Sequence, residues 1–150
     1  MARNLNWRAA PFLACLPLLA ACATADLYEL HQSAVLAYDS GEDARAEALY
    51  QGLARSAPND PETWLRLGNL YARSNRPDKA AEAYERGLLL APSDARLWYN
   101  LGIIRQRQAH ASFIAAHQYI DDADPLQART KAMIERLAPA VAEAAPAAEK

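Results

Sequence analysis

The chain has 150 residues, of which 52% are hydrophobic and 23% are charged, and its formal net charge is -2. This length suits one domain, and the high apolar content argues against a disordered chain. The nearly balanced charge gives no electrostatic reason to expect nucleic-acid binding.

The first 21 residues have the pattern of a secretory signal peptide. Arg3 and Arg8 form a short basic region, and residues 9–21 form an apolar run that is shorter than the roughly 20 residues needed to span a bilayer. The run leads into the segment LAAC, residues 19–22, which resembles the lipobox of bacterial lipoproteins. The resemblance implies cleavage before Cys22 and lipidation of Cys22, and several acyl chains anchor a protein stably. The alternatives are an ordinary signal peptide that contains a cysteine and a poor membrane anchor.

Lipidation would leave the mature chain without a free thiol, because Cys15 departs with the signal peptide and Cys22 carries the lipid. Residues 22–26 then form the lipidated end and a short linker to the folded part. Ala23 follows the cysteine, whereas in enterobacterial lipoproteins an Asp at that place favours retention in the inner membrane. By that rule we expect the periplasmic face of the outer membrane of a diderm bacterium, with the inner membrane as the alternative.

Residues 27–60 are expected to form a pair of helices, because part of their sequence recurs 34 positions later. Ala46, Tyr50 and Pro58 correspond to Ala80, Tyr84 and Pro92. Ser40 and Gly41 supply the turn between the two helices. The first helix of this unit is less regular than its counterpart, which is typical of a terminal repeat.

Residues 61–94 carry the clearest pattern in the chain. It reads W-x2-L-G-x2-Y from Trp64 to Tyr71, followed by Ala80-x3-Tyr84. The first part places its residues at i, i+3, i+4 and i+7, one stripe of a helix, and the second part marks a stripe of another helix. The pattern resembles the tetratricopeptide repeat, which has Phe where this chain has Tyr84. The resemblance implies a helix pair that needs neighbouring repeats to cover its apolar stripes.

Residues 95–123 are expected to form a third, shorter repeat. Trp98, Leu101 and Gly102 stand 34 residues after Trp64, Leu67 and Gly68. Ile114 stands where the pattern has alanine, but an amphipathic second helix is still expected in this repeat.

The end of the chain is expected to close the stack of repeats. Asp124 and Pro125 repeat the helix start seen at Asp60 and Pro61, so a capping helix is predicted over residues 125–137. Residues 139–150 are rich in Ala and Pro, and we expect a disordered tail. The predicted fold class is therefore all-α: an α-solenoid of about three tetratricopeptide helix pairs within residues 27–138, with a C-terminal capping helix.

Catalytic motifs are absent from the sequence. It contains no Gly-rich phosphate loop, no G-x-S-x-G, no H-E-x-x-H and no C-x-x-C. We expect a protein that is not an enzyme and that binds no metal or cofactor. The alternative is a divalent-metal or catalytic site built from His110, His117 and the acidic residues within 121–124. The default interpretation is that Asp124 caps the last helix and that the other groups are solvated.

The resemblance to tetratricopeptide proteins implies that the first helix of each repeat lines a concave groove for a protein or peptide partner. The groove candidates are Tyr28, His31, Tyr38, Leu65, Asn69, Arg73, Arg96, Tyr99, Asn100, Ile103 and Arg107. An amide offers a donor and an acceptor to an extended peptide, so the two asparagines are candidate backbone contacts, with plain repeat consensus as the alternative. The clamp by which chaperone-binding repeats hold a C-terminal carboxylate is not matched, because Val35 and Arg66 occupy its asparagine positions.

The predicted function is that of a lipid-anchored scaffold for protein–protein interaction in the bacterial cell envelope. The chain resembles short repeat lipoproteins that assist the assembly of pili or serve as pilots for secretins. The alternative is an adaptor for peptidoglycan enzymes or for outer-membrane protein assembly. The expected partners are a protein segment in the groove and the membrane through Cys22, with no nucleic acid. The exposed ends of a short repeat stack also make self-association plausible.

Overall fold

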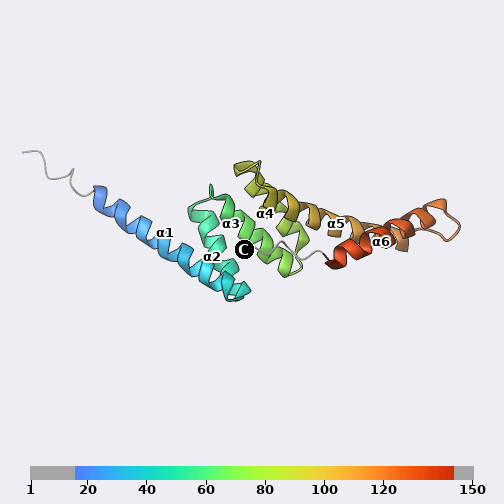
Figure 1. Cartoon of the computed structure of the whole chain (residues 1–150), viewed down its shortest axis with the longest axis horizontal. Helices are drawn as coiled ribbons and strands as arrows, with labels where there is room; N and C mark the ends of the chain where they lie inside the picture. Colours follow the sequence, from blue (N-terminus) through green and yellow to red (C-terminus); the bar gives the residue numbers. More distant parts are fainter. Residues whose placement is uncertain (1–15, 144–150) are drawn as a thin grey trace, which may run out of the picture.

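The computed structural model describes the backbone of residues 16–143 and the side chains of residues 26–142. Within these residues the chain forms six helices and no strand, which confirms the all-α fold class. In chain order they are α1 (Leu16–Asp39), α2 (Asp43–Ser56), α3 (Pro61–Arg73), α4 (Pro77–Leu90), α5 (Ala95–Gln118) and α6 (Pro125–Glu143), as Figure 1 shows.

Consecutive helices pack on one another and form three pairs: α1 with α2, α3 with α4, and α5 with α6. Contacts of α2 with α3 and of α4 with α5 join the pairs, and α3 also contacts α5. This is the arrangement of a tetratricopeptide-type α-solenoid, in which each pair covers part of its neighbour.

Two aspartates start the first helices of the second and third pairs. The carboxylate of Asp60 accepts hydrogen bonds from the backbone N–H groups of Glu62 (3.2 Å) and Thr63 (3.1 Å). Asp94 accepts one from the N–H group of Arg96 at 2.9 Å. These bonds satisfy N–H groups that have no partner within the first turn of a helix, so both aspartates fix where α3 and α5 begin.

The turns inside the first two pairs use a left-handed backbone conformation. Gly41 (φ 75°) follows α1, and Asn75 (φ 54°) follows α3. Glycine and asparagine adopt this conformation at lower cost than other residues. The chain can therefore reverse within a few residues, and α2 and α4 return along the preceding helix.

Two apolar clusters form the core. One lies around α1, α2 and α3 and includes Tyr50 and Leu67; the other lies around α3, α4 and α5 and includes Tyr84 and Leu97. The contact between α3 and α4 depends on Gly68, because a Cβ atom at this position would lie 2.2 Å from the ring of Tyr84. The glycine of the repeat pattern is thus required by the close approach of the two helices.

The third repeat differs from the prediction. The sequence predicts a second helix within residues 95–123, but α5 runs without a break from Ala95 to Gln118. The position of Asn75 in the preceding turn corresponds to Ala109 in α5, and alanine favours a continuous helix. The second helix of the third pair is therefore α6, which the sequence predicts as an additional cap.

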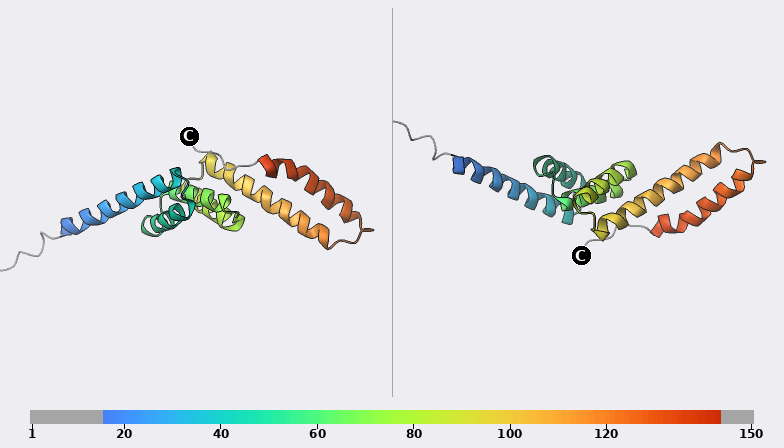
Figure 2. Two further views of the ribbon diagram at one scale, coloured as in Figure 1. Left: turned by 90° about the horizontal axis from the view of Figure 1, so that it is seen from below. Right: turned by 90° about the horizontal axis from the view of Figure 1, so that it is seen from above.

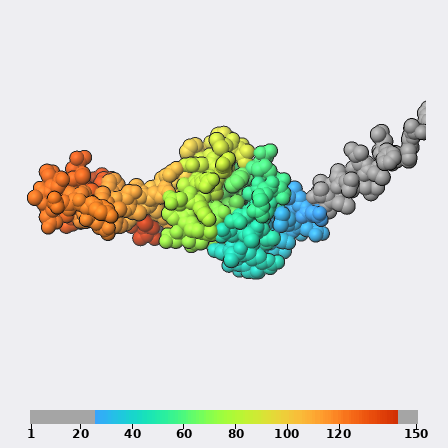
Figure 3. Space-filling model, turned by 180° about the vertical axis from the view of Figure 1, so that it is seen from behind, coloured from blue at the N-terminus to red at the C-terminus, as the bar shows by residue number. Residues whose placement is uncertain are grey.

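The last pair projects from the rest of the molecule. Among the described helices, α6 packs on α5 alone. Both views in Figure 2 show α5 and α6 as an antiparallel hairpin that extends away from α2, α3 and α4. Figure 3 shows the same projection in the molecular outline.

Both ends of the helical region are longer than predicted. Residues 23–26, predicted as a linker, belong to α1, because the stretch from Leu16 is rich in alanine and lacks glycine. Residues 139–143 of the predicted tail belong to α6, in which Leu137 and the half-buried Val141 continue one helical stripe. Residues 1–15 of the predicted signal peptide and residues 144–150 of the tail lie outside the described residues, as does the side chain of Cys22.

Candidate protein-binding face

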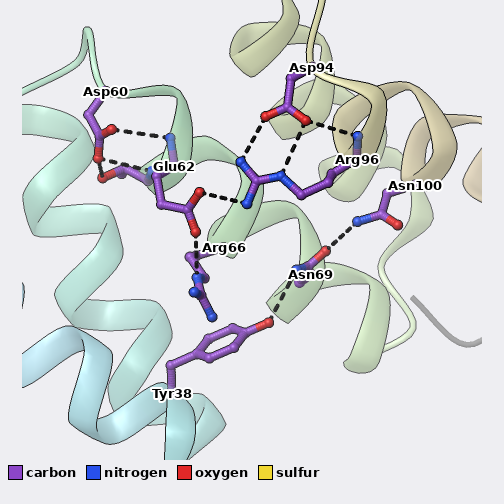
Figure 4. Close-up of polar contacts among 9 residues, drawn as sticks. Tyr38, Asp60, Glu62, Arg66, Asn69, Asp94, Arg96 and Asn100 are labelled. Atoms are coloured by element: carbon purple, nitrogen blue, oxygen red, sulfur yellow. Dashed lines mark hydrogen bonds and ion pairs between the residues drawn. The ribbon is translucent and has the colours of Figure 1, made fainter. Parts of the chain in front are cut away.

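Charged side chains of α3 and α5 form a continuous row, which Figure 4 shows from Asp94 to Tyr38. Arg96 contacts Asp94 (Nη2 to Oδ2, 2.8 Å) and Glu62 (Nη1 to Oε2, 3.2 Å). The other oxygen of Glu62 accepts a hydrogen bond from Nε of Arg66 at 2.9 Å. Together with Tyr38 of α1, these four charged residues form what we call the polar row: Asp94, Arg96, Glu62, Arg66 and Tyr38.

The contact between Asp94 and Arg96 favours the charged form of both groups. The hydrogen bond from the Arg96 guanidinium lowers the pKa of the Asp94 carboxyl, and the same contact raises the pKa of Arg96. The Arg96 side chain nevertheless remains 51% exposed, so its guanidinium can reach a ligand without leaving its carboxylate partners.

Tyr38 stands at the end of the polar row between two guanidinium groups. The Cζ atoms of Arg66 and Arg73 lie 4.5 Å and 4.3 Å from its ring centroid, within the range of cation–π interactions. Arg73 in turn donates two hydrogen bonds, of 2.7 Å and 3.1 Å, to the carboxylate of Asp43 on α2. These contacts join α1, α2 and α3 and hold the aromatic ring and both arginines in place before any ligand arrives.

Three predicted groove residues lie in the interior instead of on this face. Leu65 and Asn69 are each 1% exposed, and Asn100 is 2% exposed. The Asn69 amide donates to the hydroxyl of Tyr38 (3.2 Å) and accepts hydrogen bonds from the hydroxyl of Tyr84 (2.8 Å) and the amide of Asn100 (2.9 Å). A buried amide needs such partners, because an unpaired one costs about 1–3 kcal/mol. The predicted exposure of these residues to a bound peptide is therefore wrong.

Two hollows lie between the helices. The first, about 450 Å³ in volume, lies between the described start of α1, the end of α2 and the start of α3. It has a mainly apolar lining, with Leu27, Tyr28, His31, Leu53, Ala57, Asp60 and Thr63. The second, about 730 Å³ in volume, lies between the end of α3, the middle of α5 and the end of α6. Its lining is more polar and includes Asn75, Asp78, Ile104, Arg105, Arg107, Gln108 and Val141.

Some of the remaining predicted residues border these hollows, and others lie elsewhere on α5. Tyr28 is 64% exposed and borders the first hollow together with the exposed His31. Tyr99 is 54% exposed on α5. Ile103 and Arg107 are half-buried farther along the same helix, and Arg107 lines the second hollow.

Several members of this face are not among the predicted groove residues: Glu62, Asp94, Arg66 and Val141. Arg66 lies one helical turn after Glu62, and the i, i+4 spacing of opposite charges was the signal for their ion pair. Val141 comes from the segment predicted as a tail, so its position beside α3 and α5 depends on the unexpected length of α6.

The histidine and aspartate groups near the end of α5 do not converge. In the part of the chain that the structure describes, no group of three or more His, Cys, Asp or Glu residues could hold a metal ion. Nδ1 of His117 lies 3.2 Å from the hydroxyl of Thr130 on α6. None of the described helices is both long enough and apolar enough to cross a membrane.

A model of the tetratricopeptide repeat family matches residues 61–104. The chain is similar to the peroxisomal targeting signal receptor of Candida glabrata, with 41% identity over 69 residues, 46% of this chain and 12% of that protein. It is also similar to the receptor of the same name in Saccharomyces cerevisiae, with 44% identity over 54 residues, 36% of this chain and 9% of that protein. A protein O-mannosyl-transferase of Mus musculus is 36% identical over 85 residues, 54% of this chain and 9% of the relative.

These relatives are much longer proteins, of which the chain spans between 9% and 12%. The similarity, together with the helix pairs, shows that the chain contains a tetratricopeptide repeat. Folds of this class are typically non-catalytic scaffolds that bind other proteins.

Proposed function

We propose that the chain is a lipid-anchored scaffold of the bacterial cell envelope that holds a segment of a partner protein on the face formed by α1, α3 and α5. The observation that carries this proposal is the polar row from Asp94 to Tyr38, which is fixed by internal contacts. Preorganised groups of this kind bind with little loss of side-chain entropy.

The chemistry of the face favours an extended segment that carries both acidic and apolar side chains. The exposed rings of Tyr28 and Tyr99 offer apolar contact area, and the first hollow accepts an apolar side chain. Arg96 offers an exposed guanidinium to a carboxylate. A relative that is by name a receptor for a targeting signal supports the recognition of a segment of another protein by this type of repeat.

The envelope location is supported by the lipobox-like segment at residues 19–22. Cleavage there would leave α1 starting at the lipidated Cys22, so that helix would run directly from the membrane surface into the scaffold. Among envelope processes, we favour the assembly of a pilus or secretion complex. Adaptors for peptidoglycan enzymes or for outer-membrane protein assembly are the second candidate.

The groove test is affinity capture of the lipidated protein from solubilised membranes. Recovery of pilus or secretin components favours a role in pilus or secretion-complex assembly. Recovery of cell-wall enzymes or barrel-assembly subunits favours a role as an adaptor for those proteins.

The binding face itself is tested by substitutions. In the double variant Tyr28→Ala/Tyr99→Ala, the amount of captured partner should fall at least about tenfold, because the variant lacks both aromatic contacts of the proposed face. The fold should persist, since both side chains are exposed. Leu89→Ala is the control, since Leu89 is 77% exposed on α4, away from this face. Equal recovery by the double variant and the control would refute the proposed face.

The anchor is tested separately by Cys22→Ser and membrane fractionation. Loss of the lipid should move the protein from the membrane fraction to the soluble fraction. Retention of the variant in the membrane fraction would contradict lipidation at Cys22 and would leave the groove proposal standing.

A further inference from the structure

One face of α5 lacks a covering helix that the equivalent face of α3 has. On α3, the glycine of the repeat pattern lies against α4, where a Cβ on Gly68 would meet the Tyr84 ring at 2.2 Å. Gly102 occupies the same place 34 residues later, yet no described atom lies within 4 Å of a Cβ built there. Trp98, which matches the half-buried Trp64, is 56% exposed. The residues that pack against the second helix of a repeat are thus present on α5, but no described helix packs on them.

Exposed residues mark one stripe from Trp98 to the residue after α5, in which Ala109 and Ala116 are half-buried. Their spacing of i, i+4, i+7, i+14 and i+21 places them on the same side of a helix. We call them the open face of α5: Trp98, Gly102, Arg105, Ser112 and Tyr119, all exposed. Arg105 is already paired with Glu85 on α4, so the open face does not present an uncompensated charge at this point.

The helix α6 does not cover the open face. It lies on the side of α5 that carries His117, whose Nδ1 atom is 3.2 Å from the buried Thr130 of α6. On a helix with about 3.6 residues per turn, His117 and Tyr119 point about 160° apart. Tyr119 is therefore on a different side of α5 from the contact with Thr130, while Val141 near the end of α6 lines the same hollow as Arg105 and Ser112.

The chain itself contains a segment that matches the helix expected to cover Gly102. The helix that covers Gly68 does so with the pattern Ala80-x3-Tyr84, and the same pattern, Ala115-x3-Tyr119, stands at the end of α5, with Tyr119 as the residue that follows the helix. Both Ala115 and Tyr119 are exposed, and Tyr119 is 89% exposed, more than any other large hydrophobic residue of the described chain. The structure thus displays both halves of the α3–α4 type of contact without joining them.

The two halves cannot meet within one copy of the chain. Gly102 lies in the unbroken helix α5 and Tyr119 directly follows its last residue, 17 residues farther along the chain, which corresponds to about 26 Å at about 1.5 Å per residue. A return of the chain would need a turn near Ala109, but this residue replaces the left-handed Asn75 of the preceding repeat. Alanine pays about 1 kcal/mol or more in that conformation, so the continuous helix is favoured.

We propose that two copies of the chain form a symmetric dimer through antiparallel α5 helices, with Tyr119 of each copy packed on the partner's Gly102. Antiparallel pairing satisfies both contacts at once, because the separation of the two residues is the same in each copy. The two-fold axis then passes near residues 110 and 111, where Ala109 and Ser112 are small enough for the helices to approach closely. This closed, isologous arrangement is the commonest form of homo-oligomer. It goes beyond the proposed function, and two residues of the open face, Arg105 and Ser112, also line the second hollow.

A disulfide test distinguishes the dimer from a return of the chain on itself. Gly102→Cys and Tyr119→Cys are introduced together into the full chain carrying Cys15→Ser and Cys22→Ser, so that no other thiol remains. Disulfides need Cα atoms within about 7 Å, so a straight α5 cannot close this bond internally. Oxidation should give a covalent dimer on a non-reducing gel. Each single-cysteine variant should stay monomeric, because identical residues lie about 26 Å apart across the axis. A monomer with an internal disulfide, or no crosslink at all, overturns the proposal.

The second test measures the dimer without crosslinks, by sedimentation or light scattering of the chain carrying Cys22→Ser. Tyr119→Ala and Gly102→Leu should each raise the dimer dissociation constant at least about tenfold, because each change acts twice in a symmetric interface. Gly102→Leu should still fold, since the space around Gly102 is open within one copy and leucine favours a helix. Gln118→Ala, an exposed neighbour off the open face, should leave the constant unchanged. A wild-type chain that is monomeric, or variants with unchanged dissociation constants, would overturn the proposal.

Discussion

The carboxamide of Asn69 connects three helices besides its own, because it bonds Tyr38 on α1, Tyr84 on α4 and Asn100 on α5. Each of these bonds requires one particular residue to face the amide. The network therefore fixes the relative positions of the helices, which apolar contacts alone specify less strictly.

Replacement of Asn69 by alanine should destabilise the fold by about 2–4 kcal/mol, because it leaves up to three buried polar groups without this partner. The measurement is urea-induced unfolding followed by circular dichroism. Asn59→Ala is the matched control, since Asn59 is exposed in the loop before α3, and its effect should stay within about 0.5 kcal/mol. Equal midpoints for the two variants would show that the network contributes nothing to stability.

The position of Asn69 on α3 was predictable from the repeat pattern, but its burial was not. The repeat pattern assigns Asn69 to the inner side of α3, the first helix of its pair. Tyr38 lies on α1, the first helix of the preceding pair. Tyr84 and Asn100 arrive from the second helix and from the next pair, and their distance from Asn69 is set by packing between pairs. The exposure of Tyr28 and Tyr99 was easier to predict, because both lie where no further first helix covers them.

At the scale of single helices, α5 depends on the charge of its first capping residue. Asp94 accepts hydrogen bonds from the backbone N–H and the guanidinium of Arg96, and the guanidinium bond is the main cause of its lowered pKa. The native pKa thus lies below the unfolded value of about 3.9. The ionised group favours the folded state above that value, and this contribution disappears as the pH falls through the lowered native pKa.

Asp94→Asn should therefore lower the stability by up to about 1 kcal/mol at pH 7, while asparagine keeps a capping oxygen. The difference between wild type and variant should shrink below about pH 4 and vanish once Asp94 is protonated in the folded state. Thermal unfolding of wild type and variant at a series of pH values measures this difference in stability. Asp121→Asn, an exposed change in the loop after α5, serves as the control. A difference that stays constant down to the lowest pH would mean that the charge of Asp94 is not its source.

The length of α5 could not be predicted from the 34-residue repeat period. The starts of α3 and α6 were visible as the Asp-Pro segments at residues 60–61 and 124–125, and the first two turns were marked by Gly41 and Asn75. Near Ala109 the sequence lacks such a residue, so the helix continues, although the pattern upstream still matches a repeat. Physical signals for a turn therefore predict the break better than the repeat period does.

For the whole molecule, stability is concentrated in the first two pairs and the first half of α5, which contain both apolar clusters. Within the described part of α6, Thr130 is the only fully buried residue. The contact between α5 and α6 also holds two buried atoms without a hydrogen-bond partner among the described residues, Nε2 of His110 and Oε1 of Gln127. Each such atom costs about 1–3 kcal/mol, which weakens the hairpin further.

Amide hydrogen exchange should therefore separate α6 from the central helices. Backbone amides of α6 should exchange at least about tenfold faster than those of α3 and α4, because local opening of α6 exposes little apolar surface. Mass spectrometry of peptides from residues 125–143, compared with peptides from residues 61–90, measures the difference. His110→Leu should slow the exchange of α6, since it replaces an unpartnered polar atom with an apolar one in the α5–α6 contact. Equal protection of α6 and α3 would show that the hairpin unfolds only together with the core. Faster exchange of α6, with protection retained in the second half of α5, is the pattern expected if a second copy covers the open face of α5.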